Sequence, residues 1–144
     1  MATPYRAVHE RAIEKFSDYD ILRFDAVDRE STLNGYLLSA ITDFAPMCKT
    51  DLNDRDHELA QFNLDLSDDE IEILATGEAY YWVLPKVNNS ENLRNMLSTK
   101  DFSFFSPANL LSQLQSLRDS LQREFKRKMV NYTYRNGDIA SLKV

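Results

Sequence analysis

The most regular run of apolar residues lies between Ser67 and Pro85. Ser67 followed three residues later by Glu70 is a capping box, in which each side chain bonds the other residue's backbone N–H at a helix start. Beyond it, apolar residues recur at three- and four-residue steps, widely enough for burial on two sides. They are Ile71, Ile73, Leu74, Ala75, Tyr80, Tyr81, Trp82 and Leu84. We expect Trp82 to anchor the core and Pro85 to stop or kink the helix.

An amphipathic helix is predicted from about Pro4 to Phe16, with Thr3 as its cap. Proline is favourable at the first helical position, because the N–H that it lacks would have no helical partner there. The apolar face consists of Tyr5, Val8, Ala12 and Phe16. Residues 17–30 then form a connection that can hold a short helical turn or a strand around positions 21–24.

A second helix is predicted over residues 31–45, with Ser31 as its cap and Pro46 at its end. Its inward face is formed by Leu33, Leu37, Ala40, Ile41 and Phe44. Gly35 lowers the intrinsic helix propensity by up to about 1 kcal/mol relative to Ala.

The segment between Met47 and Leu66 has two interpretations. Phe62, Leu64 and Leu66 alternate with polar residues, which is the two-residue period of an extended segment. Alternatively, a single helical turn from His57 to Phe62 leads into the capping box that follows.

After Pro85 a short helix is predicted, capped by Asn89 or Ser90 and ending near Leu97. The connection that follows it carries three aromatic residues, which indicates that the loop is tucked into the core. These are Phe102, Phe104 and Phe105.

The longest helix is predicted from about Pro107 to Val130, with Ser106 as its cap. Steps of three and four form a seam for packing on another helix. The seam residues are Leu110, Leu114, Leu117, Leu121, Phe125 and Lys128 or Met129. Residues 131–144 continue no helical period, and Asn136-Gly137 is a turn signal.

These elements predict a mainly α protein, a small bundle of four to five helices. We expect one domain over residues 1–130 and an extended C-terminal docking tail over residues 131–144. The composition agrees, because 43% hydrophobic and 28% charged residues are typical of a globular domain. Only three Gly and four Pro favour helices with short connections over a turn-rich sandwich or barrel.

Charge is unevenly distributed along the chain. Residues 1–72 carry 17 acidic and 7 basic side chains, net −10, residues 73–144 carry 6 and 10, net +4, and the halves sum to −6. The asymmetry indicates two surfaces with different partners, although faces that are merely solvated give the same pattern. The single Cys48 forms no internal disulfide, which indicates a reducing compartment. We expect no membrane association, because no apolar run has the length of a membrane span.

No catalytic or metal-binding pattern satisfies its own geometry. Residues 51–56 begin like a calcium loop, but Arg55 stands at the third ligand position and Asp56 at the required glycine. One Cys and two His cannot complete a structural zinc site. The three glycines form neither a phosphate loop nor a dinucleotide motif. Cys48 is expected to be a small, partly buried hydrophobic residue, and we expect no enzyme and no cofactor.

Over about residues 36–132 the chain resembles the head-to-tail connector, or adaptor, proteins of the tailed-bacteriophage neck. The matching residues are Ala40-Ile41-Thr42-Asp43-Phe44, Cys48, Asp51-Leu52, Phe62, Asp65-Leu66, Glu70-Ile71-Glu72-Ile73-Leu74-Ala75, Trp82, Pro85 and Lys100-Asp101-Phe102. These are packing and capping motifs rather than catalytic ones.

The resemblance implies a small helical subunit that forms a homo-oligomeric ring, expected to hold twelve copies, beneath the portal protein. Such a ring joins the portal to the stopper or tail-completion protein and surrounds the channel through which DNA passes without sequence-specific contact. The expected location is the neck of the virion, after synthesis in the cytoplasm of the bacterial host.

We expect partner docking at the C-terminal end of the long helix and in the tail. The residues are Arg123, Lys126, Arg127, Lys128, Tyr132, Tyr134, Arg135, Ile139 and Leu142. Capping of the helix dipole can by itself explain the cations. The alternative function is a small helical regulatory or binding module that contacts nucleic acid or protein through this basic helix end.

Overall fold

The computed structural model describes residues 2–16, 26–96 and 107–136, with the side chains of residues 2–15, 30–88 and 112–135. Over these ranges the protein is mainly α, as the sequence predicts. Four α-helices are described: α1 (Tyr5–Phe16), α2 (Ala26–Phe44), α3 (Asp68–Met96) and α5 (Pro107–Asn136).

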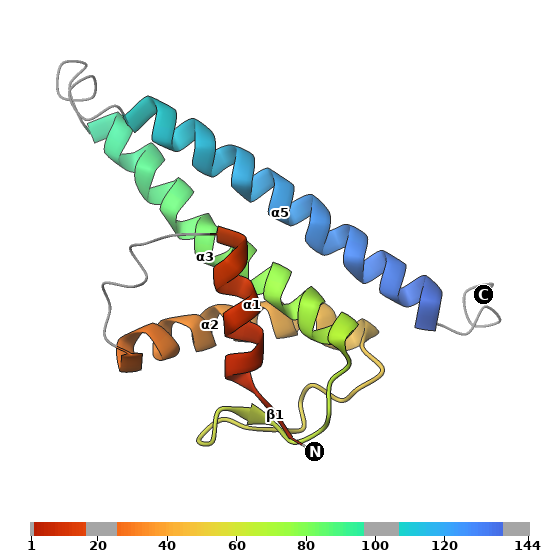
Figure 1. The fold of residues 1–144 in the computed structure, drawn as a ribbon. Coiled ribbons are helices and arrows are strands. Elements are labelled where there is room, and N and C mark those ends of the chain that lie inside the picture. The colour runs from red at the N-terminus through yellow and green to blue at the C-terminus, as the bar shows by residue number, and fades with distance from the viewer. Residues whose placement is uncertain (1, 17–25, 97–106, 137–144) are drawn as a thin grey trace.

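Helix α3 is the central element, and each of the other three helices packs extensively against it. α5 runs back along α3, so that the two form a long antiparallel hairpin (Figure 1). α1 and α2 pack beside the N-terminal part of α3, while the far ends of α3 and α5 extend beyond them (Figure 1). The subunit therefore has a compact base and a projecting two-helix arm.

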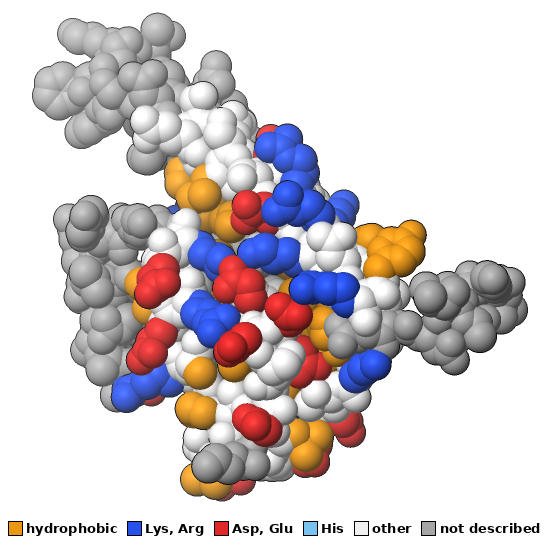
Figure 2. Space-filling model, turned by 45° about the vertical axis from the view of Figure 1, so that its right-hand side comes forward, with side chains coloured by type: hydrophobic (Ala, Val, Ile, Leu, Met, Phe, Trp, Pro, Cys, Tyr) orange, Lys and Arg blue, Asp and Glu red, His pale blue; other side chains and the backbone are white. Residues whose placement is uncertain are grey.

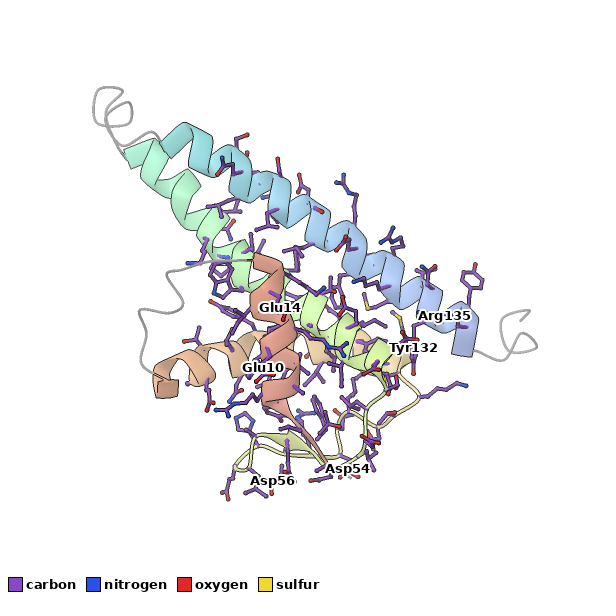
Figure 3. All side chains as sticks on the ribbon, viewed as in Figure 1. Glu10, Glu14, Asp54, Asp56, Tyr132 and Arg135 are labelled. Atoms are coloured by element: carbon purple, nitrogen blue, oxygen red, sulfur yellow. The ribbon has the colours of Figure 1, made fainter. Side chains whose placement is uncertain are left out.

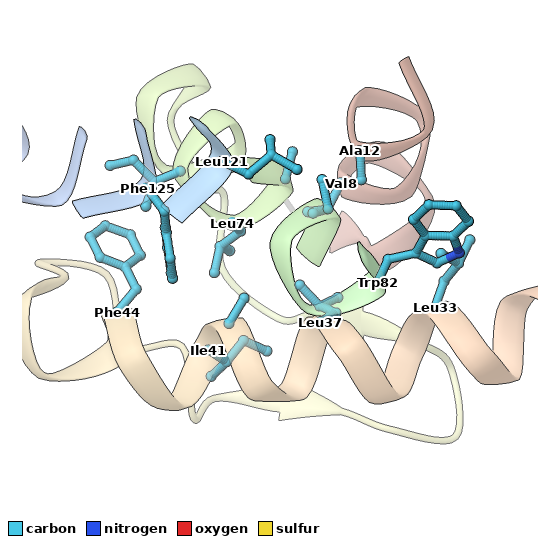
Figure 4. Packing of buried hydrophobic residues seen from close by; sticks show 14 of the residues in the cluster. Val8, Ala12, Leu33, Leu37, Ile41, Phe44, Leu74, Trp82, Leu121 and Phe125 are labelled. Atoms are coloured by element: carbon cyan, nitrogen blue, oxygen red, sulfur yellow. The ribbon is translucent and has the colours of Figure 1, made fainter. Parts of the chain in front are cut away.

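One continuous core joins the four helices, and Figure 4 shows its central part. The α2 face predicted from the sequence is buried throughout: Leu33, Leu37, Ala40, Ile41 and Phe44. Trp82 is 4% exposed, which confirms it as a core residue. Leu121 and Phe125 of the predicted seam are buried too, whereas Leu114 and Leu117 are half-buried at the core's margin.

Gly77 allows the helices to approach one another closely. A Cβ atom at this position would lie 2.6 Å from Cζ of Phe125 and 2.8 Å from Cβ of Ala40. Both distances are shorter than the closest approach of two non-bonded carbon atoms. A side chain here would therefore push α5 and α2 away from α3.

A three-stranded antiparallel sheet of very short strands covers one end of the base. β1 (Thr3–Pro4) pairs with β3 (Gln61–Phe62), and β3 pairs with β2 (Arg55–Asp56). Thr3 and Arg55 both lie opposite Phe62, whose side chain is fully buried. The strand at Gln61–Phe62 agrees with the extended interpretation, although it ends before Leu64 and Leu66. Residues 57–60 form a turn closed by the Ala60 N–H and the His57 carbonyl at 3.3 Å, but no helical turn reaches Phe62.

The expected N-cap of α1 is also wrong. Thr3 Oγ1 donates to the carbonyl of Leu64 at 3.1 Å and accepts from the N–H of Leu66 at 2.9 Å. The hydroxyl thus ties the N-terminus to the chain that leads into α3 instead of capping its own helix. Residues 3–4 instead form a strand that pairs with β3, and α1 begins at Tyr5.

Two predicted boundaries inside the base are wrong as well. α2 begins at Ala26, so Ser31 lies inside the helix and does not cap it. α3 continues through Pro85 to Met96, where the sequence predicts two helices. Proline removes one backbone hydrogen bond and costs about 3 kcal/mol in a helix interior. The fully buried Val83 and Val87, on either side of it, hold the helical path by their packing.

The C-terminal boundary differs from the prediction in the same way. α5 continues to Asn136, so residues 131–136 are helical and the division at residue 130 is wrong. Tyr132 extends the buried seam by one turn, because it follows Leu121, Phe125 and Met129 at helical steps. The expected strand or turn at 21–24, the aromatic loop at 102–105 and the tail positions Ile139 and Leu142 lie outside the described residues.

Candidate functional site

The capping box at the start of α3 is the centre of a polar network inside the subunit. Ser67 Oγ accepts the N–H of Glu70 at 3.2 Å, and Glu70 Oε1 accepts the N–H of Ser67 at 2.9 Å, as predicted. Oε1 also accepts from Thr50, while Oε2 accepts from Tyr132 Oη at 2.9 Å and from Cys48 Sγ at 3.0 Å. A single buried carboxylate thereby joins α3, α5 and the chain after α2.

Protonation in this network follows from burial and from the four donors. Burial works to raise the pKa of Glu70, but the hydrogen bonds outweigh it and hold that pKa below its usual range. Burial and the neighbouring Glu70 carboxylate raise the pKa of the Cys48 thiol to about 12. A thiol with such a pKa is protonated at neutral pH and is a weak nucleophile, in line with the packing role expected for Cys48.

A second buried pair, His9 and Glu78, lies between α1 and α3. His9 Nδ1 lies 2.6 Å from Oε1 of Glu78, and Nε2 lies 2.7 Å from Oδ1 of Asn34 on α2. Each ring nitrogen therefore has a polar partner, and the imidazolium form of the ring can donate to both. Burial opposes this charge, but Glu78 and Asn34 outweigh it and raise the pKa of His9. Burial raises the pKa of Glu78, although His9 lowers it in part.

Ion pairs around Glu72 bind the helices on another side. Its carboxylate accepts from Lys15 of α1 and from Lys128 of α5, the latter at 2.8 Å, and Arg11 lies 3.7 Å away. Lys128 also donates to Thr76 Oγ1 at 3.3 Å. The ammonium group of Lys128 is therefore bound within its own subunit.

The nine residues predicted to dock partners fall into four groups. Tyr132 is 3% exposed and packs edge-on against Phe44, so its assignment to partner docking is wrong. Lys128 and Arg135 form ion pairs inside the subunit, Arg135 with Asp69 at 3.3 Å. Figure 3 shows Arg135 near the C-terminal end of α5. Exposed positions on α5 are held by Arg123, Lys126, Arg127 and Tyr134, and the two tail positions are not described.

Arg123, Lys126 and Arg127 have no carboxylate partner within the described part of the chain. Arg123 and Arg127 line a surface hollow of about 270 Å³ with Ser120 and Glu124. Figure 2 shows blue side chains gathered over α5, with acidic side chains predominating toward the lower rim. This cationic row is the part of the predicted site that the structure leaves available to a partner.

The sequence reasoning did not identify Val130 and Leu59 as exposed apolar positions. Val130 is 51% exposed next to the cationic row, and Leu59 is 67% exposed on the loop between β2 and β3. The helical period itself contains the signal for Val130, because this position is off the seam of Leu121, Phe125 and Met129. An apolar residue off the seam faces solvent or another molecule.

Within the described residues, no group of three His, Cys, Asp or Glu side chains is arranged to hold a metal ion. A search of the same residues finds no helix with the length and apolar character that crossing a bilayer requires. No protein-family model, curated protein or solved structure matches the chain.

Proposed function

We propose that this chain is a structural protein of the tailed-bacteriophage neck, the head-to-tail adaptor. In this proposal about twelve copies form a ring beneath the portal protein, contact the stopper or tail-completion protein and surround the DNA channel. The protein works without catalysis, cofactor or membrane, and its location is the virion. The resemblance described above motivates the proposal, and its residues Ile41, Phe44, Leu74 and Trp82 all lie in the core.

The observation that carries the proposal is the unpaired cationic row on α5. Lys15, Lys128 and Arg135 are held by carboxylates of their own subunit, whereas Arg123, Lys126 and Arg127 are exposed and unpaired among the described side chains. A ring of identical subunits requires a surface that complements a different surface on the neighbour. A rigid helix with a row of free charges provides such a surface, because its backbone needs no ordering upon contact.

Binding to the portal tests this function directly. Purified chain is mixed with portal rings of the same phage, and the mixture is analysed by sedimentation and electron microscopy. We expect added density on one face of the portal with the portal's rotational symmetry, at one copy per portal subunit. A chain that neither binds the portal nor sediments with it, in low or physiological salt, contradicts the proposal.

The exposed row also favours a second candidate, a module that binds nucleic acid through phosphate contacts. Such binding weakens steeply with salt as counterions are released. The structure predicts unequal contributions, because Lys128 is held by Glu72 while Arg123, Lys126 and Arg127 are free to reach phosphate. A low-salt gel shift that is abolished by alanine at these three positions, and is unchanged by Lys128→Ala, supports this candidate over the adaptor.

A further inference from the structure

One face of α5 combines cationic and apolar side chains. Arg123, Arg127, Val130 and Tyr134 follow one another at steps of four, three and four, which places them on one side of a helix, with Lys126 next to them. All five are exposed, Tyr134 at 70%. We call this set the α5 stripe.

The loops around the small sheet combine the opposite charge with apolar side chains. We call the exposed residues here the hairpin patch: Asp51, Asp54, Glu58, Leu59 and Leu64. Asp51 accepts the N–H of Asn53, and Asp54 accepts the side-chain amide of Asn63. These bonds shape the turns without neutralising charge, and no cation of the described part pairs with the three acids.

The two surfaces together account for most of the exposed apolar side chains. Five large hydrophobic residues are exposed in the described part of the chain: Leu59 and Leu64 in the hairpin patch, Val130 and Tyr134 in the α5 stripe, and Met47. Each surface thus has charge beside apolar area, the arrangement found where a protein interface has a dry centre and a charged rim.

The sheet, beside which Asp54, Glu58, Leu59 and Leu64 lie, is apart from α5 within one subunit. Asp51, by contrast, follows Lys49, whose N–H binds Tyr132 of α5. α3 lies between α5 and the sheet, and the sheet lies at the opposite side of the base (Figure 1). Figure 3 shows Asp54 at the sheet, well apart from the end of α5 that carries Arg135. A contact between the α5 stripe and the residues beside the sheet therefore joins different molecules.

We propose that the α5 stripe of one copy docks on the hairpin patch of the next copy of this chain. The proposal specifies the contact between neighbouring subunits of the adaptor ring. It rests on the proposed function only in assuming that these contacts close into a ring. Charge is complementary across the contact, and the apolar pairs supply area that excludes water. A nucleic acid fits less well, because phosphate leaves Val130 and Tyr134 without apolar partners.

The contact is heterologous, since two different surfaces meet, and it therefore repeats from copy to copy. Charge reversal gives a specific signature. Variant A carries Arg123→Glu and Arg127→Glu, and variant B carries Asp54→Lys and Glu58→Lys. All four positions are exposed, so both variants should fold, which circular dichroism verifies. Glu10→Lys, at an exposed position of α1, is the control for a change of charge alone.

Self-association is measured by sedimentation velocity at low salt over a range of concentrations. Contacts are mapped by zero-length carbodiimide cross-linking of mixed isotope-labelled and unlabelled chains. We expect the wild type and Glu10→Lys to associate, with intermolecular cross-links from Lys126 to the hairpin patch. A alone and B alone should associate at least tenfold more weakly. A mixed with B should recover association, because reversed stripe meets reversed patch.

The proposal is overturned if A or B associates like the wild type, if the mixture does not recover, or if the wild type neither associates nor cross-links. Loss of DNA binding in A, with self-association unchanged, assigns the α5 stripe to nucleic acid and also overturns it. Portal binding separates this result from the proposed function. If the chain binds the portal while variants A and B assemble like the wild type, the proposed adaptor function stands and the subunits use another contact.

Discussion

Replacing Tyr132 with Phe tests whether the end of α5 belongs to the core. The ring stays, so its packing against Phe44 is retained, and only the hydroxyl is lost. That hydroxyl donates to Oε2 of Glu70 and accepts the backbone N–H of Lys49, both at 2.9 Å. The substitution therefore removes one of four donors to a carboxylate that is 3% exposed, and it leaves the Lys49 amide without this partner.

The expected cost follows from the kind of bond that is lost. A hydrogen bond to a charged group contributes about 1.5–3 kcal/mol, and a buried group left without a partner costs a similar amount. We therefore expect Tyr132→Phe to lower the free energy of unfolding by about 2 kcal/mol.

Tyr134→Phe is the matched control, since Tyr134 lies two residues further on the same helix and is 70% exposed. Urea unfolding, followed by circular dichroism at neutral pH, measures both. The pKa of Glu70 is lowered in the folded protein, so the stability it contributes is present above about pH 4.5 and is lost as pH falls through the folded pKa. The cost of Tyr132→Phe should therefore shrink at low pH. Equal stabilities of the two variants at neutral pH would refute the assignment of Tyr132 to the core.

Three further predictions follow from the helix contacts. Gly77→Ala should destabilise the fold by about 1–3 kcal/mol through overpacking. Gly35→Ala should stabilise it slightly in the same urea assay, because no atom lies within 4 Å of the added Cβ. The opposite order of stabilities contradicts the packing described around Gly77. The pKa of His9 is raised in the folded protein, so its pairing with Glu78 stabilises fully below about pH 6.5 and less as pH rises through the folded pKa. Relative to His9→Gln, the wild type should lose stability as pH rises, and parallel pH profiles would exclude this role. Deleting residues 137–144 should leave the thermal midpoint within about 2 °C, because the core of the described residues already has its last buried side chain at Tyr132. A larger drop in calorimetry contradicts this prediction.

The sequence predicted correctly those features that depend on residue spacing within a single helix. The capping box at Ser67 and Glu70, the buried face of α2 and the seam of α5 depend on spacing within one element, and a sequence displays such spacing directly. Thr3 shows the limit of this reasoning. Its Thr-Pro pair has the form of a helix cap, but pairing with β3, almost sixty residues away, gives the hydroxyl other partners.

The buried charges of the site were not predicted, for a related reason. Glu78 falls on the apolar face of α3, and His9 falls beside Val8 on the buried face of α1, so each alone looks like an exception to an amphipathic pattern. Only the packing of α1 on α3 brings them to 2.6 Å and makes each the other's partner. Tyr132 was assigned to a tail for a different reason: residues 131–144 were read as continuing no helical period, although Tyr132 lies three residues after Met129 on the buried seam.

The most direct test of the account is an electron cryo-microscopy structure of the chain bound to its portal. The account predicts a closed ring of identical copies on one face of the portal. Neighbours in that ring are joined by Arg123, Arg127 and Tyr134 of one copy against the sheet loops of the next. Single copies scattered on the portal, or a ring in which α5 faces away from every neighbour, would contradict it.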